Sequence, residues 1–128
     1  MTKVIQKADV KSLLDRKDVN ELIEVLKYGG TRAMQMDAAV ALGMIGDKKA
    51  IEPLFEMINN KYEWIDIRVY AVQSLGRIGG RKAIEALKKA ADYKDFHGRS
   101  EDVEAIRNAA KTALNLVSPG KKRWQIWK

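Results

Sequence analysis

The chain has 128 residues and a net charge of +7, with 46% hydrophobic and 32% charged residues. This length suits one domain, and the balance of apolar and charged residues excludes a disordered chain. The sequence contains no cysteine, which excludes disulfides, thiolate zinc sites and a cysteine nucleophile and fits a reducing compartment. Only two prolines and nine glycines occur, so we predict a mostly helical protein.

The first ten residues mix single apolar side chains with Lys3, Lys7 and Asp9. They lack the continuous apolar stretch of a signal peptide. No uncharged run in the chain approaches the roughly 18 residues that a membrane-spanning helix needs. The sequence therefore predicts a cytoplasmic protein that does not enter a membrane.

An internal repeat organises the sequence. Residues 41–54 recur 33 residues later as residues 74–87, each copy with Leu-Gly-x-Ile-Gly followed by Ala-Ile-Glu-x-Leu. A partial third copy follows at residues 107–117, and a degenerate copy stands earlier at residues 18–26. Such periods are typical of stacked helical units. We predict a single domain, residues 1–128, of four units with irregular outer units, at approximately 1–28, 31–59, 64–91 and 101–128.

Each unit is predicted to be a pair of helices. In the second half, Ile51, Leu54, Phe55 and Ile58 fall at i, i+3, i+4 and i+7, and residues 19–26 repeat that spacing one unit earlier. This is one apolar helix face. The first half is apolar over a wider arc and rich in alanine, as expected for a helix that neighbours pack from more than one side.

The turns inside the units carry helix-ending residues. Gly46 and Gly79 stand where the first helix must end, since glycine readily takes the left-handed conformation of a helix C-terminus. Asp18 and Asp47 precede the second helices and are expected to accept hydrogen bonds from their free amide groups. The connections are short except at residues 59–64 and 92–102.

Helix pairs of this length bury their apolar faces only by stacking, which predicts a solenoid with capped ends. The pattern of Arg68, Leu-Gly-x-Ile-Gly at residues 75–79 and Ala-Ile-Glu-x-Leu at residues 83–87 resembles the HEAT-like repeats of the phycobilisome-lyase type, over about residues 31–117. The resemblance implies an all-α fold, an α-solenoid (α-α superhelix) of about four HEAT-like helix pairs. Gln35 stands where the resemblance expects the arginine seen at Arg68.

The resemblance leaves the activity open, because such repeats occur in bilin lyases, iron-dependent hydroxylases, relatives that act on alkylated DNA and simple scaffolds. The hydroxylases hold iron with several His-Glu pairs, whereas His97 is the only histidine here. We therefore predict no metal and no cofactor. The sequence also lacks a Gly-x-Ser-x-Gly turn and a Walker phosphate loop. We predict that the chain is not an enzyme and that His97 is an exposed loop residue.

One pair of residues is similar to the arrangement in the DNA-acting relatives, which place an acidic residue near tryptophans. Trp64 with Asp66 is the nearest arrangement in this chain. Asp66 directly precedes an apolar helical run that starts at Ile67, so we expect its carboxylate to cap the N-terminus of that helix instead.

Basic residues recur in pairs in the turn between the first and second helix of each unit. Equivalent turns of a solenoid stack about 10 Å apart. The pairs are therefore predicted to form a basic ridge along one edge, a candidate surface for nucleic acid or another polyanion. This basic ridge comprises Arg16, Lys17, Lys48, Lys49, Arg81, Lys82, Lys121 and Lys122.

Acidic residues recur on the second helices, whose surfaces usually line the groove of such solenoids. An acidic groove repels phosphate. The sign of the charge changes towards the C-terminal end, which suits a protein partner with its own charge pattern. The predicted protein-binding groove comprises Glu21, Glu24, Glu52, Glu56, Glu85 and Lys89.

Aromatic residues follow the second helices on the edge opposite the basic ridge. We expect Tyr28, Tyr62 and Tyr93 each to pack over a helix end, as amphipathic rings commonly do. Near the C-terminus, Trp124 and Trp127 align with apolar second-helix positions and are expected to cover the last helix pair as a cap.

These patterns favour a non-catalytic protein-protein interaction or adaptor module whose partner is another protein. The alternative is a nucleic-acid or polyanion binder that uses the basic ridge, with weak and non-specific affinity. A bilin-lyase-like or DNA-acting enzyme is a third and less favoured hypothesis. The sequence leaves open whether the chain is a monomer or a homodimer.

Overall fold

The computed structural model describes residues 7–95 and 97–117. Within these ranges the chain forms helices and turns and no strand, which confirms the predicted all-α class. The helices are α1 (Lys7–Asp15), α2 (Val19–Tyr28), α3 (Arg32–Ile45), α4 (Ile51–Asn59), α5 (Ile65–Ile78), α6 (Gly80–Ala91) and α7 (Ser100–Val117). A short 3₁₀ turn, η1 (Lys48–Ala50), precedes α4. The predicted cap of Trp124 and Trp127 lies outside the described residues.

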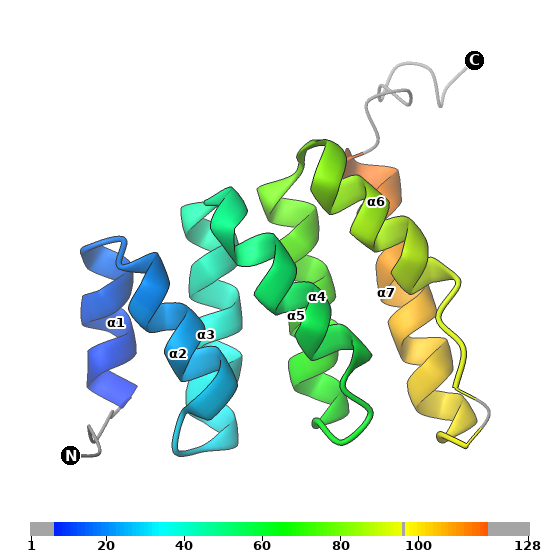
Figure 1. The fold of residues 1–128 in the computed structure, drawn as a ribbon, viewed down its shortest axis with the longest axis horizontal. Helices are drawn as coiled ribbons and strands as arrows, with labels where there is room; N and C mark the ends of the chain where they lie inside the picture. The colour runs from blue at the N-terminus through cyan, green and yellow to red at the C-terminus, as the bar shows by residue number, and fades with distance from the viewer. Residues whose placement is uncertain (1–6, 96, 118–128) are drawn as a thin grey trace.

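The helices stack as a solenoid (Figure 1). First helices α1, α3, α5 and α7 form one layer, and second helices α2, α4 and α6 pack across them. The turns α1–α2, α3–α4 and α5–α6 lie at the upper edge of Figure 1, and the other connections lie at the lower edge. The repeat in the sequence thus becomes a repeat in space.

Small residues bring the first helices close together. Gly43 of α3 lies against Ser74 of α5, and a Cβ atom at position 43 would stand 2.8 Å from the Ser74 Oγ. Gly76 of α5 lies against Ala113 of α7, where a Cβ would stand 3.1 Å from the alanine Cβ. The buried Ser74 hydroxyl donates a hydrogen bond to the carbonyl of Ala39, so its polar group is satisfied.

The second helices provide the other half of the core. Each packs chiefly on the first helix that follows it, and Leu22, Leu54 and Leu87 are fully buried there. Burying one such side chain contributes about 1.5–3 kcal/mol. The predicted apolar face of α4 is confirmed, with Phe55 half-buried. The second helices contact one another little, which leaves space between them.

The helix ends follow the predictions for the turns at Gly46, Gly79 and Asp18, and differ at Asp47. Gly46 ends α3 with φ 78°, and Gly79 ends α5 with φ 67°. The Asp18 side chain accepts a hydrogen bond from the first turn of α2 at 3.3 Å. The Asp47 side chain accepts from the Lys49 N–H at 2.9 Å, so it caps η1 rather than α4 itself.

One polar contact is repeated where each second helix meets the next first helix. The Nε atoms of Arg68 and Arg107 donate to the carbonyls of Ile58 and Tyr93, at 2.8 and 2.7 Å. Gln35 occupies the same place, and its Nε2 donates to a carbonyl at the end of α2 at 2.9 Å. Carbonyls at helix ends lack helical partners. The glutamine therefore preserves the contact that the arginines make.

Candidate functional site

The described residues of the basic ridge share one edge of the solenoid. All are exposed: Arg16, Lys17, Lys48, Lys49, Arg81 and Lys82. Their turns lie at the upper edge of Figure 1. The Lys48 side chain reaches the neighbouring turn, because its Cε is 3.9 Å from the position of a Cβ at Gly80. Lys121 and Lys122 lie outside the described residues.

The residues of the predicted protein-binding groove lie on α2, α4 and α6. Glu21 is half-buried, and the others are exposed: Glu24, Glu52, Glu56, Glu85 and Lys89. Glu56 forms an ion pair with Lys27 of α2, with 3.8 Å between nitrogen and oxygen. An exposed pair of this kind contributes little to stability, and it links two neighbouring second helices.

An open hollow of about 550 Å³ lies between α4 and α6. Its lining comprises Lys48, Lys49, Ile51, Glu52, Phe55, Lys82, Glu85, Ala86 and Lys89. The lining combines lysines of the basic ridge with glutamates of the protein-binding groove. The sequence patterns predict these as two separate surfaces. The turn lysines and the second-helix acids therefore meet in one site.

The chemistry of this α4–α6 hollow is mixed. Phe55 contributes a half-buried apolar ring, and the Lys89 Nζ lies 5.8 Å from the centre of that ring. Cations over aromatic faces interact favourably. Glu52 and Glu85 place negative charge beside the lysines, so the site opposes a purely anionic ligand and suits a surface that carries both signs.

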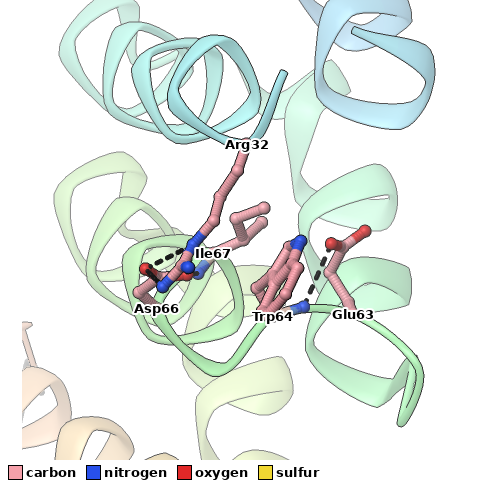
Figure 2. Close-up of polar contacts among 5 residues, drawn as sticks. All are labelled: Arg32, Glu63, Trp64, Asp66 and Ile67. Carbon is pink, nitrogen blue, oxygen red and sulfur yellow. Dashed lines mark hydrogen bonds and ion pairs between the residues drawn. The ribbon is translucent and has the colours of Figure 1, made fainter. Parts of the chain in front are cut away.

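Asp66 does not cap α5, so that prediction is wrong. The helix begins at Ile65 with Trp64 at its N-cap, which places Asp66 in the first helical turn, where acidic residues favour the helix dipole. There its carboxylate accepts hydrogen bonds from the guanidinium of Arg32 on α3 (Figure 2). This hydrogen bonding lowers the pKa of Asp66, and burial opposes the shift in part.

The Arg32 guanidinium also lies over the Trp64 ring, 4.5 Å from its centre. Asp66 is therefore an ion-paired carboxylate, and the ring of the neighbouring Trp64 lies under the same arginine. Arg32 was not singled out in the sequence, because its partner lies 34 positions away and belongs to the next helix pair.

The comparison with known families agrees with this architecture. The family model described as HEAT repeats matches residues 19–115. The chain belongs to the HEAT repeat family. The match runs from the start of α2 into α7, and no curated protein matches the chain. HEAT repeats typically serve as protein-interaction scaffolds.

The aromatic edge of this HEAT repeat protein differs from the prediction at two of three tyrosines. Tyr28 and Tyr62 are 75% and 87% exposed, so they do not pack over helix ends. Tyr62 lies in the connection after α4, where the Lys61 Nζ is 5.4 Å from its ring centre. Tyr93 is half-buried, and the Arg68 guanidinium lies over its ring at 5.0 Å, so its packing over a helix end stays a prediction.

Across residues 7–95 and 97–117, no three histidine, aspartate or glutamate side chains gather closely enough to hold a metal ion. His97 is exposed between α6 and α7, as predicted. Among the helices described, none combines the length and the apolar character needed to cross a membrane. The absence of a cofactor stays a prediction.

Proposed function

We propose that this HEAT repeat protein is a non-catalytic interaction or adaptor module that binds another protein across the α4–α6 hollow. The observation that carries the proposal is Phe55, a half-buried ring surrounded by lysines and glutamates in an open hollow. An apolar centre with a charged rim is the usual anatomy of a protein interface. The alternating charges supply specificity for a complementary partner.

Finer features of the proposal come from the sequence. The Leu-Gly-x-Ile-Gly and Ala-Ile-Glu-x-Leu motifs support the phycobilisome-lyase type of HEAT repeat. The pairs α1–α2, α3–α4 and α5–α6, followed by α7, support the division into four units within one domain. A cytoplasmic location is supported by the lack of cysteine, because the fold needs no oxidising compartment.

The proposal is tested by affinity capture from lysate with and without nuclease treatment. The double variant Glu52→Lys and Glu85→Lys reverses two charges of the hollow, and Glu101→Lys with Glu104→Lys reverses two exposed charges of α7 as a matched control. We expect the hollow variant to lose the captured protein and the α7 variant to retain it. Capture that the hollow variant retains, or that nuclease abolishes, contradicts the proposal.

Polyanion binding through the basic ridge is the second candidate function. It is favoured by the approach of Lys48 to the turn at Gly80, because charges that neighbouring turns bring together can neutralise phosphates jointly. The glutamates in the adjoining hollow oppose the same ligand.

A further inference from the structure

The guanidinium of Arg68 is buried with one nitrogen atom unpartnered. The residue is 3% exposed, and its Nε donates to the carbonyl of Ile58. Its plane lies over the Tyr93 ring. The Nη2 atom has no hydrogen-bond partner among the described residues. A buried charged donor without an acceptor is unfavourable, so folded proteins normally provide one.

Arg68 also lines a hollow of about 230 Å³ beside the α6–α7 connection. The charged residues of its lining are Lys61, Arg68, Arg99, Asp95 and Asp102, together with His97. Three permanent cations thus face two carboxylates. This connection is the longest of the repeat, since Arg107 follows Arg68 by 39 residues instead of 33. Residues of this longer connection line the hollow together with Lys61 and Arg68.

Neither carboxylate of the lining is paired directly with Arg68 in the described part of the chain. The Asp95 Oδ1 accepts a hydrogen bond from the backbone N–H of His97 at 3.0 Å. The other Asp95 oxygen would stand 2.5 Å from a Cβ at Gly98, so this side chain is folded against its own loop. Neither Asp95 nor Asp102 forms an ion pair with Arg68 in the described part of the chain.

We propose that this Arg68 hollow binds a single oxyanion of the carboxylate or phosphate type. Arg68 is the anchoring donor, because a guanidinium offers N–H groups in one plane that match the oxygens of such anions. Lys61 and Arg99 add positive charge beside it. The volume suits one anionic group rather than an extended ligand. The proposal is independent of protein binding at the α4–α6 hollow.

The chain itself offers the variant that tests this site. Gln35 makes the same backbone contact at its own boundary, so Arg68→Gln is expected to keep the contact with Ile58 and to lose the anion donor. Arg107→Gln is the matched control, since Arg107 makes the equivalent contact one unit later. Arg99→Gln changes an exposed residue of the hollow and therefore tests the site without altering the core.

The probes are sodium phosphate and sodium acetate, titrated against sodium chloride at equal ionic strength and followed by amide chemical shifts in NMR spectra. We expect saturable shifts at residues 97–103. Affinity is expected to fall about tenfold or more in Arg68→Gln, as for a lost charged hydrogen bond, and to fall less steeply in Arg99→Gln. It is expected to stay within about twofold in Arg107→Gln, because Arg107 does not line this hollow and glutamine is expected to keep the contact with the Tyr93 carbonyl.

The two probes distinguish the source of the anion. Tighter binding of acetate identifies a carboxylate group as the ligand, and tighter binding of phosphate identifies a phosphate group; both support the oxyanion site. The absence of saturable shifts with either probe overturns the proposal. Equal losses in Arg68→Gln and Arg107→Gln also overturn it, because they indicate diffuse attraction to a basic protein. If Arg68→Gln does not fold, an unchanged affinity in Arg99→Gln overturns the proposal by itself.

Discussion

Arg32 and Asp66 join two consecutive helix pairs by a two-point ion pair. The Arg32 Nε lies 3.2 and 2.9 Å from the two carboxylate oxygens, and its Nη2 donates to one of them as well. Both side chains are partly exposed, at 47% and 29%, so solvent weakens the pair. The contact links the start of α5 to α3, and the same guanidinium lies over the ring of Trp64 (Figure 2).

The ion pair predicts a pH-dependent contribution to stability. Hydrogen bonding from Arg32 lowers the pKa of Asp66 from its ordinary value of 3.8. The pair therefore stabilises the fold fully above that value, and the contribution is lost as pH falls through the lowered pKa. In urea unfolding, we expect Asp66→Asn to be less stable than the parent at about pH 7 and the difference to shrink at about pH 3. A difference that grows in acid contradicts the role of the pair.

The close approach of α3 and α5 predicts that replacing Gly43 by alanine lowers the stability of the fold. A Cβ at Gly43 would stand 2.9 Å from the Ser74 Cα, a backbone atom. Alanine in a helix interior is normally favoured over glycine by about 1 kcal/mol. We expect Gly43→Ala to destabilise the protein by about 1–3 kcal/mol instead, through overpacking. Thermal unfolding measures this.

Gly76→Ala is the matched control for that substitution. The nearest atom to the Cβ added at position 76 is the Ala113 Cβ at 3.1 Å. A small shift of α7 is enough to relieve this contact. We expect a smaller loss than at Gly43. Equal stability of the parent and Gly43→Ala would show that α3 and α5 are farther apart than described.

The repeated polar contact predicts a difference between two substitutions of Gln35. Methionine keeps the length of the side chain but removes the donor to the end of α2, so we expect a loss of about 0.5–1.5 kcal/mol in Gln35→Met. Arginine restores the donor used at Arg68, and we expect Gln35→Arg to retain stability. Chemical denaturation distinguishes them, and equally destabilised variants would show that the contact is unimportant.

Much of the fold follows from local patterns. The spacing of apolar residues in α4 and the glycines at 46 and 79 predicted helix faces and helix ends, because both depend on residues within a few positions of one another. The start of α5 does not follow in this way. The sequence pattern predicts Asp66 as the N-cap before Ile67, whereas the helix begins at Ile65. Apolar periodicity does not fix the first turn, and the partner that places Asp66 there is on α3.

The candidate sites depended more on tertiary structure. The residues of the ridge and the groove were predicted, but their meeting at the α4–α6 hollow requires the spacing between second helices, which no local pattern encodes. The exposure of Tyr62 also depends on tertiary structure, because an aromatic ring packs over a helix end only where a neighbouring element provides a surface for it. The unpartnered Arg68 Nη2 is likewise a product of packing.

The alternative function makes a quantitative prediction about salt. If the basic ridge neutralises about four phosphates, log affinity for duplex DNA falls with log salt with a slope near −3.6. Replacing Lys48, Lys49, Arg81 and Lys82 by glutamine is expected to flatten the slope without changing stability, because exposed charges contribute little. We expect affinity in physiological salt no tighter than roughly 10⁻⁴ to 10⁻⁶ M. Much tighter binding that these substitutions abolish would favour the polyanion function.

Protein binding at the α4–α6 hollow is tested most directly by hydrogen–deuterium exchange of the protein alone and in complex with the captured partner. We expect slower amide exchange at residues 48–55 and 82–89 in the complex, with α1 and α7 unchanged, because the hollow is lined from those two segments. Protection confined to the first-helix layer, or to the connections at the lower edge, would contradict the assignment of the hollow as the binding site.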